Sequence, residues 1–208
     1  MRVRGLLTLV SLGCTLFASA ALGDPVCIPG TKLSIHLDCK VETKGDAMND
    51  IEESARQVLD DAREFSFETP SGVFGSVMAY TPKEEFRAMS TEWTDMMAKG
   101  IEDAIEGDAK ITGHDIGKYG DRDAHFLTME LKSGDVECNT EFIVIGGKGE
   151  IILLAMTADM KDKVASAEQK SILASLTYEG ASVTGRHKAP NLEMPSLPKP
   201  GVLVLQRK

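Results

Sequence analysis

The chain has 208 residues, a net charge of -9 and 42% hydrophobic residues, a composition typical of a globular protein rather than a disordered one. The excess of acidic residues argues against nucleic acid or an anionic membrane surface as a partner, because either would require clustered Lys and Arg. The length predicts one domain, large enough to bury its own core.

Residues 1–23 have the order of charged, apolar and small segments that defines a secretory signal peptide. Arg2 and Arg4 form the positive start, residues 6–17 are apolar, and small residues follow. No later apolar run approaches the ~20 residues that a membrane span needs. We therefore expect a periplasmic or secreted protein without a transmembrane segment.

Two cleavage points fit this segment, after Ala20 and after Gly23, and we expect the second because polar residues begin directly after it. A lipid anchor on Cys14 is the alternative interpretation. Ser11, however, stands where a lipobox requires an apolar residue. Removing the two arginines of the signal takes the net charge from -9 to -11, and this acidic balance favours solubility.

Three cysteines remain after cleavage, namely Cys27, Cys39 and Cys138. An odd number in an oxidising compartment indicates one disulfide and one free thiol. Cys39 and Cys138 both fall on the apolar face of an expected strand, so we expect that pair to be bridged. The alternative is that all three thiols are free.

Hydrophobic periodicity predicts alternating strands and helices in a single α+β domain over residues 24–180. The expected elements are a strand over 33–41, a helix over 47–63, a hairpin of 65–67 and 73–80, a helix over 82–107, four strands between 110 and 158, a helix over 160–175 and a short strand over 176–178. The wholly apolar Ile151–Met156 should be the central strand of the sheet. We expect an antiparallel sheet of about six to seven strands covered by helices, an α/β/α sandwich.

Residues 181–208 read as a proline-rich C-terminal tail, with four prolines between Pro190 and Pro200. The apolar run Val202–Leu205 breaks this polar pattern. We expect it either to dock as a short strand on a sheet edge or to be a loose end.

Part of this pattern resembles the PsbP-like family, named for an extrinsic subunit of photosystem II and including small bacterial envelope proteins. The resemblance covers residues 64–179 and rests on the order of elements and on four short segments: Tyr80-Thr81-Pro82, Gly120–Ala124, Glu150–Leu154 and Ser175-Leu176. The second segment is one residue longer than the Gly-x-x-Ala step of the family. The resemblance implies an antiparallel sheet covered by helices that serves as a binding or assembly module.

The most suggestive chemical cluster surrounds the turn at residues 120–121. A two-residue turn there would place His114 opposite Leu127, with His125 diagonally across on the same face and Asp123 nearer the turn. Two imidazoles and a carboxylate are ligands for zinc or copper. The alternative is a solvated polar hairpin with an ion pair between Lys118 and Asp123.

No His-Glu-x-x-His, Cys-x-x-Cys or Gly-x-Ser-x-Gly pattern occurs in the sequence, so the common zinc, redox and hydrolase signatures are missing. We therefore expect an exported, soluble, non-enzymatic binding or assembly module of the bacterial envelope. Its partner would be an envelope protein or a small ligand. The alternative is a periplasmic metal-binding protein that uses the His114/His125 hairpin, and the sequence does not decide whether the protein is an enzyme.

Overall fold

The computed structural model describes residues 24–190 apart from 52, 106 and 148. The expected signal peptide, with Cys14, and the apolar run Val202–Leu205 lie outside the described residues. The strands are β1 Pro25–Cys27, β2 Leu33–His36, β3 Glu42–Asp46, β4 Leu59–Glu68, β5 Phe74–Pro82, β6 Ala109–Tyr119, β7 Arg122–Ser133, β8 Val136–Gly147, β9 Glu150–Asp159, β10 Thr177–Tyr178 and β11 Val183–Lys188. The helices are the 3-10 helices η1 Met48–Asp50 and η2 Glu84–Met89, and the α-helices α1 Glu53–Arg56, α2 Ser90–Ala104 and α3 Lys163–Ser175.

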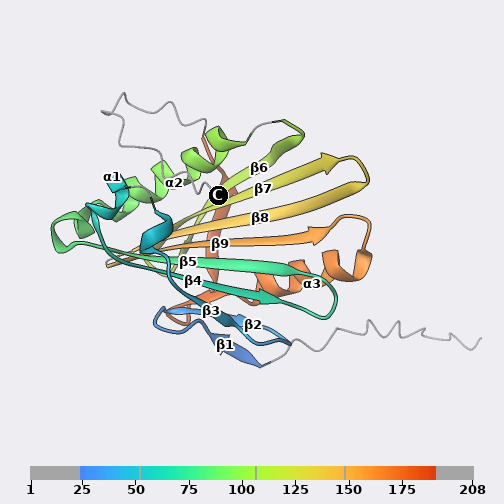
Figure 1. Ribbon diagram of the computed structural model, residues 1–208, viewed down its shortest axis with the longest axis horizontal. Helices are drawn as coiled ribbons and strands as arrows, with labels where there is room; N and C mark the ends of the chain where they lie inside the picture. Colours follow the sequence, from blue (N-terminus) through green and yellow to red (C-terminus); the bar gives the residue numbers. More distant parts are fainter. Residues whose placement is uncertain (1–23, 52, 106, 148, 191–208) are drawn as a thin grey trace, which may run out of the picture.

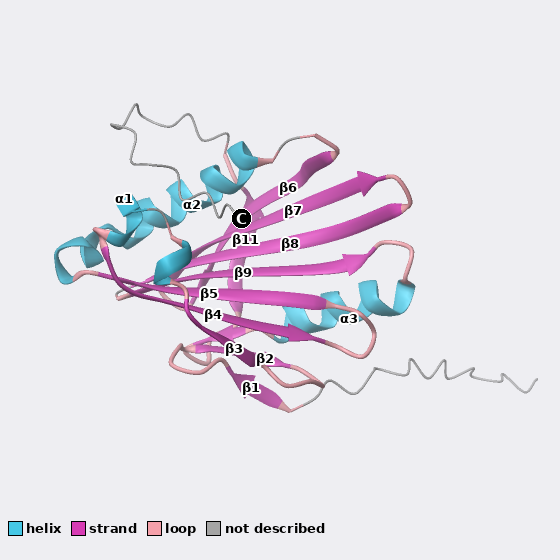
Figure 2. Ribbon diagram, viewed as in Figure 1, coloured by secondary structure: helices cyan, strands magenta, loops and turns pink. Residues whose placement is uncertain are grey.

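An eight-stranded antiparallel sheet dominates the molecule, in the order β11-β6-β7-β8-β9-β5-β4-β3 (Figure 2). Short turns join β6 to β9 in sequence, as the pattern of residues 110–158 predicts. β9 lies between β8 and β5, and Ile151–Leu154 are buried, which confirms the central strand. The fold is thus α+β as expected, but the sheet is larger than the six to seven strands predicted.

Helices cover the two faces of this sheet at opposite ends (Figure 1). The sheet face that α2 covers carries the core cluster of Met78, Tyr80, Trp93, Val144, Ile151 and Leu153, with apolar residues from the segment before β4. The other face carries the larger cluster, to which α3 and the small sheet β1-β2-β10 contribute. Strand alternation sends successive residues of β5, β8 and β9 into different clusters, so both cores share one sheet.

The strand expected over residues 33–41 ends at His36, and the next strand, β3, begins only at Glu42. Leu33–His36 pairs with β1 and β10, whereas Glu42–Asp46 pairs with β4 at an edge of the main sheet. Leu33, Ile35 and Leu37 are nevertheless all buried in the same cluster. The alternation correctly predicted which side chains are buried, but burial does not specify which strand they pair with.

The helix expected over residues 47–63 is wrong for most of its length. The chain forms only η1 and α1 there and becomes strand β4 at Leu59. A bulge shifts the register of β4 between Leu59 and Asp61, so that Leu59 and Ala62 are both buried in the same cluster. A spacing of three buried residues therefore arises from a bulged strand and imitates a helical period.

The proline-rich tail begins later than residue 181, because Val183–Lys188 forms β11 beside β6. In Figure 1 this strand, coloured red, runs at a steep angle to the other strands of the sheet. Gly117 of β6 permits the approach, since a Cβ there would lie 3.2 Å from the Thr184 carbonyl oxygen and 3.3 Å from the Arg186 Cα. Arg186 then donates from Nε to Asp115 at 2.9 Å. Polar composition masked a strand that is held mainly by its backbone.

The bridge expected between Cys39 and Cys138 is not formed, and Cys27, Cys39 and Cys138 are free thiols. Cys39 packs against the cluster on the α3 side of the sheet. Cys138 alternates in phase with Val144, which belongs to the cluster under α2. The two cysteines therefore lie on opposite faces of the sheet, although each belongs to an apolar pattern.

Candidate functional site

The β6–β7 hairpin has the register that the sequence predicts. Tyr119 pairs with Arg122 across the turn, and His114 pairs with Leu127. Gly120 adopts a φ of 62° in this turn, a left-handed conformation that suits glycine. His125 pairs with Ile116, so the two histidines lie diagonally on one face of the hairpin, as expected.

Helix α2 covers this face and places two carboxylates beside the histidines. Asp95 and Glu102 are two helical turns apart and therefore project from the same side of the helix. Glu102 Oε1 lies 2.8 Å from His114 Nδ1, and Asp95 Oδ1 lies 2.8 Å from His125 Nε2. Between them, His114 Nε2 lies 2.9 Å from His125 Nδ1. The four side chains form one continuous hydrogen-bonded chain between helix and sheet.

Proton counting defines the charge of this chain. Its three hydrogen bonds require three protons, whereas two neutral imidazoles supply only two. With both carboxylates ionised, all three bonds form together only if one imidazole is doubly protonated. His114 is the more exposed ring, with 13% of its side chain accessible against 5% for His125. In that state the charge belongs on His114, which donates to Glu102 and to His125 Nδ1, while neutral His125 donates from Nε2 to Asp95.

Burial supports this assignment. It lowers the pKa of His125, and the nearby charge of His114 acts in the same direction. The Asp95 carboxylate opposes this effect through charge and a hydrogen bond, and Asp123 opposes it through charge. The lowered pKa keeps His125 neutral, which is the form that accepts the hydrogen bond from His114.

The third expected metal ligand is directed elsewhere. Asp123 accepts from Lys118 Nζ at 2.7 Å, which is the ion pair of the solvated-hairpin alternative. Two nitrogens bound to one tetrahedral zinc would be about 3.3 Å apart, and the facing nitrogens of the histidines are closer. Within residues 24–190, as far as they are described, no three His, Cys, Asp or Glu side chains are grouped to hold a metal ion. Zinc or copper binding thus remains a prediction from the sequence.

The geometry of this cluster fits a structural role rather than a catalytic one. Each of the four ring nitrogens has a partner inside the cluster, so none is directed at a substrate. Sequence analysis missed Asp95 and Glu102. Their spacing of seven on an amphipathic helix was the available signal, but it also fits an exposed helix face.

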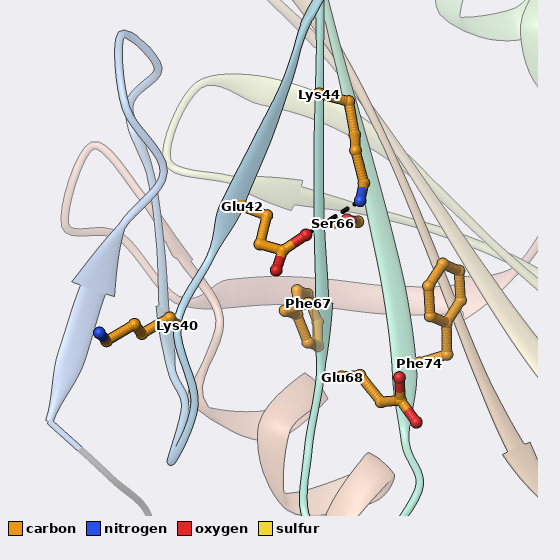
Figure 3. Close-up of a pocket in the computed structure, with 7 residues that line it drawn as sticks. All are labelled: Lys40, Glu42, Lys44, Ser66, Phe67, Glu68 and Phe74. Atoms are coloured by element: carbon orange, nitrogen blue, oxygen red, sulfur yellow. Dashed lines mark hydrogen bonds and ion pairs between the residues drawn. The ribbon is translucent and has the colours of Figure 1, made fainter.

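A separate hollow of about 310 Å³ lies beside the β3 edge of the sheet, lined by Lys40, Glu42, Lys44, Ser66, Phe67, Glu68 and Phe74 (Figure 3). Lys44 Nζ donates to Glu42 at 3.0 Å within it. Phe74, at the start of β5, is 44% exposed. The hollow therefore combines balanced charges with one accessible aromatic ring.

Comparison with known proteins identifies no family for this chain. No family model matches it and no curated protein matches it. A crystal structure of a protein from Bacteroides thetaiotaomicron VPI-5482 is similar over 76% of this chain and 48% of its own, at 12% identity and a TM-score of 0.41. This chain spans about half the length of that protein. No helix in the described part of the chain is long and apolar enough to cross a membrane.

Proposed function

We propose that this protein is an exported, non-enzymatic binding or assembly module of the bacterial envelope. The pattern of residues 1–23 supports export to the periplasm or beyond. The internal hydrogen bonding of the histidine cluster supports a role without catalysis, because its chemical groups are used to attach α2 to the sheet. The partner is an envelope protein or a small ligand.

The exposed Phe74 ring carries this proposal. It lies on the face of the sheet that α2 covers, but at the end of β5 far from that helix, beside Ser76 and opposite Thr157. Ser76, Ala155 and Thr157 are only half-buried there, so no element in the described part of the chain covers this end of the face. Small side chains beside an accessible aromatic ring form the kind of surface at which aromatic anchors contribute binding energy.

Contact through this face is favoured over addition of a strand at a sheet edge. The two edges of the main sheet are β3 and β11, and a register shift interrupts the pairing of each. β3 is also short, and it carries exposed Glu42 and Lys44. Short, charged and bulged edges discourage pairing with another chain.

The PsbP-like resemblance is part of the proposal. The order of hairpin β4–β5, helix α2, strands β6–β9 and helix α3 supports it. In that family the fold serves as a binding or assembly module, which is consistent with the proposed role.

Photocrosslinking in the native envelope tests the proposal. A photoreactive amino acid at position 74 should crosslink to one dominant partner. The same group at Val164 on α3, which is 68% exposed, serves as the control for a merely accessible apolar position. Equal labelling at both positions, or none at position 74, would contradict the proposed surface, and a protein found only inside the cell would contradict export.

A further inference from the structure

A second hollow, of about 360 Å³, lies where the β1–β2 turn meets one end of the main sheet. It is lined by Gly30, Thr31, Lys32, Arg63, Thr81, Arg87, Gly149 and Glu150. Thr81 lies near the end of β5 and Phe74 at its start, so the two hollows are separated by nearly the length of that strand. The inference drawn here therefore concerns a second site and goes beyond the proposed function.

Charge distinguishes this hollow from the one in Figure 3. Lys32, Arg63 and Arg87 come from three separate segments and line it with a single carboxylate, Glu150. That carboxylate already accepts from the Tyr178 hydroxyl. The hollow in Figure 3 has two lysines and two glutamates instead. Each of the three cations also has a carboxylate partner outside the lining, namely Glu179, Asp61 and Asp60.

Two contacts hold Arg63 in place beside the hollow. Its Nη2 donates to the Gly30 carbonyl oxygen at 3.0 Å, which fixes the guanidinium beside the β1–β2 turn. Its Nε is buried without a hydrogen-bond partner, although Asp61 Oδ2 lies 2.9 Å away. That carboxylate is therefore not aligned with the N–H group. Because Nε is closed to solvent, the charge of the guanidinium, and not this N–H group, is what Arg63 offers to a ligand in the hollow.

The carboxylates that compete for these cations are exposed and readily exchanged. Lys32 pairs with Glu179, whose side chain is 37% exposed. Arg87 Nη2 lies 3.8 Å from Asp60, whose side chain is 50% exposed. Exposed pairs of this kind contribute only about 0–1 kcal/mol each. A ligand with several anionic oxygens could replace them at little cost.

We propose that this hollow binds a tetrahedral oxyanion, namely a phosphate group. Arginine forks and a lysine ammonium match phosphate oxygens with charge-assisted hydrogen bonds, and Thr31 and Thr81 add hydroxyl groups to the lining. The same chemistry is present in free inorganic phosphate and in the headgroup of an anionic lipid. The net negative charge of the chain favours the free anion over a membrane surface.

Calorimetric titration of the full mature chain with inorganic phosphate at low ionic strength tests the proposal. Lys32→Gln and Arg87→Gln should each weaken binding about tenfold, the value of one charge-assisted hydrogen bond. Lys44→Gln is the matched control, because Lys32 and Lys44 side chains are both 50% exposed and both pair with a glutamate. This control should bind phosphate as the parent does.

Sedimentation with vesicles separates the two sources of phosphate. Phosphate binding that depends on Lys32 and Arg87 supports a site for the free anion. Binding only to phosphatidylglycerol vesicles, and not to phosphatidylcholine vesicles, with the same dependence supports a lipid headgroup. Absence of binding to either, or an equal loss in Lys44→Gln, overturns the proposal. The circular dichroism spectrum of each variant establishes that its fold is retained.

Discussion

At the scale of residues, one proton decides whether α2 is held to the sheet by three hydrogen bonds. The chain from Glu102 through His114 and His125 to Asp95 is complete only when the histidine pair carries a single positive charge. A second proton on the pair would place two N–H groups face to face. Two cations lie close to this cluster. Lys99 Nζ is 3.8 Å from Glu102 Oε2, and Lys118 pairs with Asp123.

Stability should therefore fall in mild acid. The pKa of His125 in the folded chain is lowered by burial, whereas its value in the unfolded chain is about 6.5. Between these two values the unfolded chain binds more protons, so the free energy of unfolding decreases as the pH falls below about 6.5. The urea midpoint should be lower at about pH 5.5 than at about pH 6.5.

His125→Gln should reduce this dependence on pH, because the titrating ring is gone. His187→Gln is the control, since His187 is exposed and its ring Nδ1 lies 2.6 Å from the Gly185 carbonyl oxygen of the same strand. An unchanged pH dependence in His125→Gln would show that carboxylates outside the cluster cause the acid sensitivity.

At the scale of elements, β11 is attached by its backbone pairing with β6 and by one side chain, Arg186. All six of its residues are exposed, so apolar burial contributes little. Arg186 pairs with Asp115, and its guanidinium carbon lies 4.6 Å from the centre of the Phe126 ring. These two contacts tie the strand to both β6 and β7.

Arg186→Gln should weaken β11 by about 1 kcal/mol, the sum of a surface ion pair and a cation–π contact. Trypsin should then cleave after Lys188 several-fold faster, a rate that follows the population of the opened strand. Lys132→Gln on β7 is a control for the loss of one exposed cation, since its ammonium lies 3.8 Å from Glu130. Cleavage at the parental rate in Arg186→Gln would mean that backbone pairing alone holds the strand.

At the scale of the whole molecule, the two core clusters should unfold together. They lie on opposite faces of one sheet, and β5, β8 and β9 contribute side chains to both. Trp93, the single tryptophan of the chain, is 9% exposed in the cluster under α2. Its fluorescence reports one face, whereas far-ultraviolet circular dichroism reports the whole sheet.

The two signals should give the same urea midpoint in the parent chain, because loss of the shared strands removes both cores. Two separate midpoints would show instead that α2 and its cluster unfold independently of the α3 face.

The sequence by itself determined the elements whose evidence is local. The turn at residues 120–121 and the alternation on each side of it set the β6–β7 register, and with it the shared face of His114 and His125. The apolar run at Ile151–Leu154 likewise identified the central strand, because a strand buried on both faces has no polar side.

Only the tertiary structure decided what each pattern contacts. Asp95 and Glu102 became partners of the histidines because α2 crosses the β6–β7 hairpin, and nothing in their helix specifies that crossing. The bulge after Leu59 and the separation of Cys39 from Cys138 have the same origin. Periodicity records that a side chain is buried, whereas the identity of its neighbours depends on segments distant in the chain.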